Sequence, residues 1–249
     1  MTDSSDQLTA VRTLLATATR RLLGDTVGVD DPAWRAPSRL PRWSRGHVAT
    51  HLARQADALG RLVAWASTGA RQDMYASPQQ RVDDIEAGSD RPGLELQVDL
   101  DTSAERLADA FAALDEIDVR DRPEGATVVG WDAEVELRGG QRVTARLLPV
   151  ARMTEVVLHH IDLDIGFGVD DVDDETARWL LEWSAYRLGA RDEFPLLTLI
   201  DEPGSELTLG SSGPGRTITG SSPALLGWLT GRAGPDRVRG ADGLVLPGL

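Results

Sequence analysis

The four histidines of this 249-residue chain lie in only two segments, and one segment also carries a glutamate at helical spacing. His47 and His51 are four residues apart, and Glu155 precedes His159 by four. Residues four apart lie on one face of a helix. Two such helices packed face to face could present His51, Glu155 and His159 to one metal ion. Three protein ligands leave a coordination position open, which is typical of a catalytic zinc site.

A purely structural interpretation of the second segment stays open at this point. Its neighbouring residues are apolar, so a glutamate and a histidine on the same face need partners. Glu155 could pair with an arginine such as Arg152, while His159 simply packs. His160 points about 100° away from His159, and we expect it to be a packing or surface residue. Asp162 could orient a ligand or form a salt bridge.

The first segment has alternatives of its own. His47 and His51 form an HxxxH pair that could itself bind metal. His47 could instead hydrogen-bond to a helix terminus or to a metal ligand. Of the seven tryptophans, Trp43 lies nearest this helix, and we expect it to border a pocket.

Composition excludes several classes of function. The net charge is -14, with 40 acidic and 26 basic residues, which argues against nucleic acid and anionic membranes as partners. The chain has no cysteine, so any thiol chemistry must use a thiol from outside. The polar N-terminus and the lack of an apolar run of ~20 residues predict a cytoplasmic protein. We expect a monomer.

Apolar periodicity predicts an α+β protein with four long helices in its first part. The helices are expected over 6–23, from a cap at Ser44 to Gly69, from a cap at Ser103, and over 148–165. A short helix should begin near Ser77-Pro78, and a small hairpin should involve 128–131 and 135–137. After a boundary at Gly168, two further helices and short apolar runs predict a small antiparallel sheet, with 211–216 as a hairpin turn.

Three stretches together carry a resemblance to a known family: WSRGHVATHLARQADAL, WASTGARQDMYASPQQRVDDIEAGS and ARMTEVVLHHIDL. They resemble the mycothiol-dependent maleylpyruvate isomerases, which belong to the DinB-like metal-binding helical bundles. The resemblance implies a four-helix bundle over 1–168 and a smaller C-terminal α/β domain over 169–249. The match is looser in the C-terminal part.

The resemblance also implies a site. His51, Glu155 and His159 match the zinc ligands of the family, and Arg81 and Arg232 match its arginines for substrate and catalysis. We add Trp43 and His47 as candidate residues around the bound thiol. A His/Glu/His set also tolerates nickel, cobalt or iron.

The reaction implied is the cis–trans isomerisation of maleylpyruvate to fumarylpyruvate in gentisate breakdown. Its cosubstrate would be mycothiol or another small thiol such as ergothioneine, and its substrate a small dicarboxylate. Two alternatives stay open: a zinc-dependent S-transferase that conjugates a small thiol to another electrophile, and a non-catalytic metal-binding module.

Overall fold

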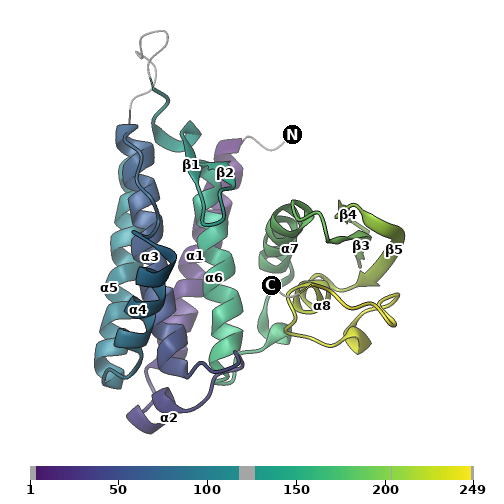
Figure 1. Ribbon diagram of the computed structural model, residues 1–249, viewed down its shortest axis with the longest axis horizontal. Coiled ribbons are helices and arrows are strands. Elements are labelled where there is room, and N and C mark those ends of the chain that lie inside the picture. The colour runs from purple at the N-terminus through teal and green to yellow at the C-terminus, as the bar shows by residue number, and fades with distance from the viewer. Residues whose placement is uncertain (1–3, 118–126, 203, 248–249) are drawn as a thin grey trace. The chain divides into compact units, whose positions relative to one another are not determined.

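The computed structural model describes residues 4–117, 127–202 and 204–247 (Figure 1). The chain forms two compact units, Met1–Ile165 and Gly166–Leu249. Each unit has its own buried apolar core. In the described residues, no helix is both long enough and apolar enough to cross a membrane.

The first unit is the expected four-helix bundle. Its long helices, which run side by side in Figure 1, are α1 (Ser4–Thr26), α3 (Arg45–Thr68), α5 (Gly93–Asp115) and α6 (Leu148–Leu163). Helix α6 packs against both α1 and α3, and α3 also packs against α5. Buried leucine, valine and alanine side chains at helical spacing fill the centre, as the sequence pattern predicts.

Helix α3 begins and ends where the sequence signals place it. The Ser44 side chain accepts a hydrogen bond from the backbone of His47, and Gly69 ends the helix with a left-handed φ of 75°. Helix α1, by contrast, continues through the predicted stop at Gly24 and ends at Thr26. A glycine at an exposed helical position only lowers helix propensity and does not by itself end the helix.

The predicted start of α5 at Ser103 is wrong. Helix α5 begins ten residues earlier, at Gly93, and Ser103 is buried within it, donating to the carbonyl of Leu100. A tertiary contact sets the true start. Gly93 N–H donates to Asp31 of α2 (Asp31–Arg35), and a Cβ at Gly93 would lie 2.5 Å from the Trp34 ring. No cap residue in the local sequence signals this start.

Shorter elements connect the long helices. Helix α4 (Pro78–Ser89) begins after Ser77, as predicted, with the Ser77 hydroxyl accepting from the Gln80 backbone. The hairpin before α6 pairs β1 (Glu134–Glu136) with β2 (Arg142–Thr144) in antiparallel register. The predicted strand at 128–131 is absent from the described residues there, and a 3₁₀ turn, Gly130–Asp132, lies in its place.

The second unit contains two helices, α7 (Asp174–Gly189) and α8 (Ser222–Leu229), and a three-stranded sheet of order β4-β3-β5. Strand β3 (Pro195–Asp201) pairs antiparallel with β4 (Glu206–Leu209), as expected. Strand β5 (Ser212–Gly220) pairs parallel with β3, so the sheet is mixed.

The hairpin turn predicted at 211–216 is wrong, because most of this segment forms the start of β5. The chain turns earlier, at Gly210, and passes the end of β3 to reach its other edge. Gly210 has a φ of 73°, and a Cβ there would lie 2.1 Å from the Pro195 carbonyl oxygen. Only glycine fits this crossing.

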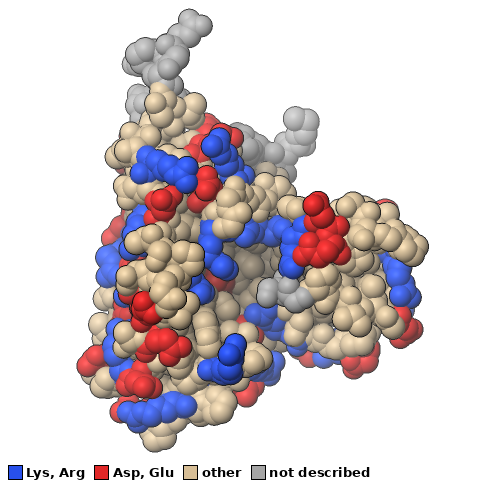
Figure 2. Space-filling view, in the orientation of Figure 1, with Lys and Arg blue, Asp and Glu red and all other residues tan. Residues whose placement is uncertain are grey.

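Charges of both signs are interspersed over the face of the helical unit seen in Figure 2. Arginine side chains lie beside aspartate and glutamate side chains and do not gather into one basic surface there. Such mixed charge keeps a surface soluble without creating a strong field of one sign.

Candidate metal centre

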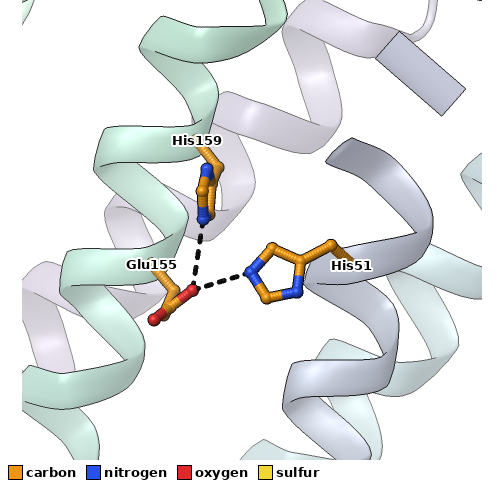
Figure 3. Close-up of side chains that lie close together, drawn as sticks. All are labelled: His51, Glu155 and His159. Carbon is orange, nitrogen blue, oxygen red and sulfur yellow. Dashed lines mark hydrogen bonds and ion pairs between the residues drawn. The ribbon is translucent and has the colours of Figure 1, made fainter. Parts of the chain in front are cut away.

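His51, Glu155 and His159 converge inside the helical unit (Figure 3). His51 comes from α3, and the other two come from successive turns of α6. Glu155 Oε2 lies 3.1 Å from His51 Nε2 and 3.3 Å from His159 Nε2. One ligand atom from each residue falls within 4.8 Å of the others. The three residues expected from their spacing are thus brought together.

The separations between Glu155 and the two histidines fit ligands of one metal ion. Zinc bonds of about 2.0–2.1 Å in tetrahedral geometry place neighbouring ligand atoms about 3.3 Å apart. Both contacts to Glu155 are close to this value. Two imidazoles and one carboxylate are a ligand set of catalytic zinc sites, and such a set leaves the fourth position for water or substrate.

His51 is prepared to act as a neutral ligand. Burial lowers the pKa of His51 to about 4. The hydrogen bond with Glu155 opposes this shift in part, whereas the charges of His159 and Arg81 add to it. The ring therefore carries no net charge at neutral pH. A metal ion binds a neutral imidazole without first displacing a charge-carrying proton.

Glu155 is held as a carboxylate by the two histidines. Burial alone would raise the pKa of Glu155, but hydrogen bonds from His159 and His51 outweigh it and hold that pKa well below its usual value. About a third of the side-chain surface, 34%, still reaches solvent. The centre is therefore accessible from outside.

His159 is oriented by the next turn of its own helix. Its Nδ1 lies 2.8 Å from Asp162 Oδ2, on a carboxylate that is itself buried. Burial would lower the pKa of His159, but the hydrogen bonds to Asp162 and then Glu155 outweigh burial and raise it. A carboxylate on the second ring nitrogen directs the first toward a metal. Asp162 thus has the ligand-orienting geometry that the sequence suggested.

Arg81, from α4, contacts the ring of His51. Its Nη2 lies 3.3 Å from His51 Nδ1. A guanidinium only donates, so Nδ1 is the acceptor and the ring hydrogen is on Nε2, from which it is donated to Glu155. This places a fixed positive charge beside the three candidate ligands.

Tyr75 is a site residue that the sequence reasoning did not single out. Its ring lies under the Arg81 guanidinium, 5.9 Å from ring centroid to Cζ. Burial raises the pKa of Tyr75, with Arg81 opposing in part, so its hydroxyl keeps its proton at neutral pH. The available signal was its place in the MYASPQQR stretch, six residues before Arg81.

Trp43 and His47 lie at the start of α3, next to the centre. The Trp43 ring stacks on His47 at 6.2 Å and meets the edge of His51 at 5.5 Å. His47 Nδ1 belongs to the helix cap with Ser44, and its Nε2 lies 3.3 Å from Glu86. Both ring nitrogens of His47 therefore have protein partners, and the geometry favours the helix-cap interpretation over metal binding.

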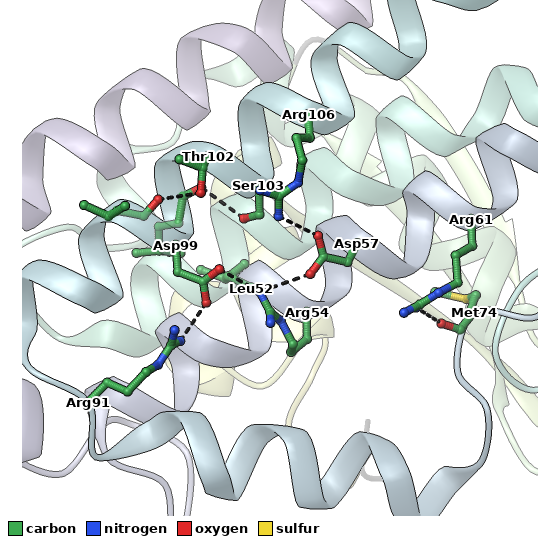
Figure 4. A network of polar contacts seen from close by, with 12 residues as sticks. Leu52, Arg54, Asp57, Arg61, Met74, Arg91, Asp99, Thr102, Ser103 and Arg106 are labelled. Carbon is green, nitrogen blue, oxygen red and sulfur yellow. Dashed lines mark hydrogen bonds and ion pairs between the residues drawn. The ribbon is translucent and has the colours of Figure 1, made fainter.

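The helix that carries His51 is fixed to α5 by a network of charged side chains (Figure 4). Arg54 lies 3.0 Å from Asp57 and 2.6 Å from Asp99, and Arg91 also binds Asp99, at 2.6 Å. Arg106 completes the network on Asp57 at 2.9 Å. Single exposed ion pairs contribute little, but shared carboxylates make a network that holds both helices in register.

Three further residues considered from the sequence have contacts in the structure. Arg152 does not pair with Glu155 and donates instead to the Leu52 carbonyl and the Gln55 side chain. His160 is buried and lies 3.1 Å from Asp25 of α1, as a packing residue should. Arg232 lies in the second unit, where its Nη1 donates to the Thr230 carbonyl.

Comparison with known proteins places the fold in a family. The sequence model described as the mycothiol maleylpyruvate isomerase N-terminal domain matches residues 15–164. A crystal structure of the mycothiol-dependent maleylpyruvate isomerase is similar at 28% identity and a TM-score of 0.82, and each chain is covered in full. A crystal structure of a variant of that enzyme, with a histidine replaced by alanine, is similar at 27% identity and a TM-score of 0.81, also with full coverage of both chains. No curated protein sequence matches. The chain belongs to the mycothiol maleylpyruvate isomerase family.

Proposed function

We propose that the protein is a zinc-containing, thiol-dependent isomerase that converts maleylpyruvate to fumarylpyruvate in gentisate breakdown. The observation that carries this proposal is the convergence of His51, Glu155 and His159 within a fold similar over its whole length to mycothiol-dependent maleylpyruvate isomerases. The cosubstrate is mycothiol or a related small thiol such as ergothioneine. The chain itself has no cysteine, so the reacting sulfur comes from this cosubstrate.

The three residues would hold the metal through His51 Nε2, His159 Nε2 and a carboxylate oxygen of Glu155. When bound, zinc lowers the pKa of a thiol so that the thiolate forms near neutral pH. Asp162 keeps the hydrogen of His159 on Nδ1, which leaves Nε2 free to act as a ligand.

The isomerisation needs only a reversible addition. The thiolate sulfur adds to the activated carbon–carbon double bond, and the electron pair moves to the conjugated keto oxygen to form an enolate. The former double bond is now single and rotates. The enolate electrons then re-form the double bond in the trans geometry and expel the thiolate, so atoms and charge balance.

Arg81 supplies the positive charge that a dicarboxylate and an enolate require. Its guanidinium lies beside the centre, and a charged donor in a partly buried site stabilises developing negative charge more than solvent would. Tyr75 keeps its proton next to Arg81, and we propose that its hydroxyl donates a hydrogen bond to the enolate oxygen. Arg232 is proposed, from the family resemblance, to bind a substrate carboxylate.

The fate of the thiol tests this proposal against an S-transferase. Proton NMR of maleylpyruvate with zinc-loaded protein and mycothiol should show fumarylpyruvate while the total free thiol stays constant. Accumulation of a thiol adduct in step with thiol loss would instead identify a transferase. No change of substrate by protein that holds stoichiometric metal would show that the proposed reaction is wrong.

A further inference from the structure

A second concave site lies between α1 and α5, with a volume of about 860 Å³. Its floor consists of buried side chains from three helices: Leu15, Leu107, Phe111 and Arg152. Alanines form part of its walls, among them Ala16 and Ala108. None of the residues of the metal centre lines this cleft. A volume of this size is in the range of small-molecule sites.

The floor carries a buried arginine that has no ion-pair partner among the described residues. Arg152 is 3% exposed, and its Nη1 donates to two neutral acceptors on α3, the Leu52 carbonyl and the Gln55 side-chain oxygen. Among the described residues, no carboxylate lies within ion-pairing distance of Arg152, and the charges of Glu155 and Asp57 act on it only from farther away. Buried charges in proteins are normally paired.

Burial weakens the proton affinity of this guanidinium but does not remove its charge. The pKa of Arg152 falls to about 10, because burial outweighs the more distant carboxylate of Glu155 and the other negative groups around it. At neutral pH the side chain therefore stays cationic. A cation in the lining of an apolar cleft, with only neutral hydrogen-bond acceptors, is an arrangement that suits an anion.

We propose that the α1/α5 cleft binds a small organic acid, with its anionic head on Arg152 and its apolar body along the two helices. The aliphatic and aromatic floor suits an apolar body. The rim carries two carboxylates, Asp101 and Glu105, and two arginines, Arg12 and Arg20, so it offers no surplus of positive charge for a polyanion such as a nucleotide. A single anionic group with a hydrocarbon portion satisfies both features, and the bound acid supplies the counter-charge that Arg152 lacks.

Two fluorescent probes of the same shape test the role of charge. The first is anilinonaphthalenesulfonate, an anion, and the second is N-phenylnaphthylamine, its neutral relative. Metal-loaded full-length protein should bind the anionic probe at one site and more tightly than the neutral probe. The substitution Arg152→Met should lower the affinity for the anionic probe by about tenfold or more. Binding of the neutral probe should change much less. Equal affinity of wild-type protein for both probes would overturn the proposal.

A cleft-filling variant tests the location without touching the arginine. Ala108→Trp introduces a large side chain into the cleft and should abolish binding of both probes. Ala113→Trp makes the same change on α5 at an exposed position outside the cleft, and it should bind as wild type does. Unchanged binding to Ala108→Trp would place the probe elsewhere and refute the site.

If Arg152→Met fails to fold, a competition experiment tests whether the cleft recognises negative charge. Octanoate should displace the anionic probe from the wild-type protein, and octanol at the same concentration should not. Equal displacement by both would show that the cleft recognises only apolar surface. Isomerase activity of Ala108→Trp should match that of Ala113→Trp, because the metal centre does not share the cleft.

Discussion

The Nη2 atom of Arg81 lies 3.3 Å from Nδ1 of His51, which fixes the ring hydrogen of that histidine on Nε2. Nε2 is also the atom that faces Glu155 and would bind the metal. A metal on Nε2 requires the hydrogen on Nδ1, where it can no longer accept from Arg81. Metal binding through Nε2 would therefore break the Arg81 contact with His51, and the proposed loading of the centre would free the guanidinium for a substrate carboxylate.

Arg81→Met should consequently leave metal binding intact and reduce kcat/KM on the order of 100-fold, because the proposed charged donor to substrate and enolate would be lost. Metal analysis and a maleylpyruvate assay check both parts. Arg106→Met, which removes an exposed arginine from the α3–α5 network, serves as the control and should stay within about threefold of wild type. Loss of metal from Arg81→Met would show that the arginine supports the ligands instead of the substrate.

The three candidate ligands should behave as a unit. His51→Ala, Glu155→Ala and His159→Ala should each purify without stoichiometric metal and lose activity. Added zinc should raise the melting temperature of the wild-type protein, because a ligand of the folded state stabilises it, and should not raise that of the variants.

The matched control for these variants is His160→Ala, a buried histidine on the same helix. It should keep metal and activity while costing about 1–3 kcal/mol of stability, because its packing and its contact with Asp25 are lost. Metal loss in His160→Ala would mean that the ligand has been assigned to the wrong neighbour.

Asp162 should matter through His159. Asp162→Ala removes the acceptor from Nδ1 and should weaken zinc binding by about 10–100-fold, as substitutions behind metal-binding histidines commonly do. Asp162→Asn keeps an acceptor oxygen but no charge, so its loss should be smaller. Zinc competition with a chromophoric chelator measures both affinities. An affinity for zinc that is the same in all three proteins would contradict the positioning role.

Tyr75 should make the free energy of unfolding depend on pH in the alkaline range. Burial raises the pKa of Tyr75 in the folded protein above its usual value of 10.0. A pKa raised by folding means that the folded state keeps a proton that the unfolded chain releases. The free energy of unfolding should therefore fall as pH rises above about 10 and through the folded-state pKa.

Tyr75→Phe removes this group, so its stability should fall less steeply over the same pH range. Chemical denaturation of the metal-free protein at several alkaline pH values measures the difference. The control is Tyr186→Phe, an exposed tyrosine of the second unit, which should leave the pH dependence of unfolding of the helical unit unchanged. Parallel curves for wild type and Tyr75→Phe would rule out the buried, protonated hydroxyl.

The sequence predicts best what local chemistry decides. The cap at Ser44, the stop at Gly69 and the i, i+4 pair of Glu155 and His159 follow from spacing alone, and the structure bears out the helices that carry them. The start of α5 at Gly93 does not follow from local spacing, because it depends on close packing against Trp34, which is distant in the sequence.

Pairings between distant segments account for the other differences. Residues 211–216 are rich in glycine and serine, which favours a turn, yet pairing with β3 makes most of them strand. The contact of Arg81 with His51, the place of Tyr75 and the unpaired charge of Arg152 depend on how helices meet, and no spacing rule within one helix reveals them.

The most direct test of the central claim is an ultraviolet assay of maleylpyruvate conversion in which metal and thiol are varied independently. Protein stripped with a chelator should be inactive, and activity should return in proportion to zinc up to one ion per chain, only when mycothiol or another accepted small thiol is present. Conversion by the metal-free protein, or by the zinc-loaded protein without any thiol, would contradict the account.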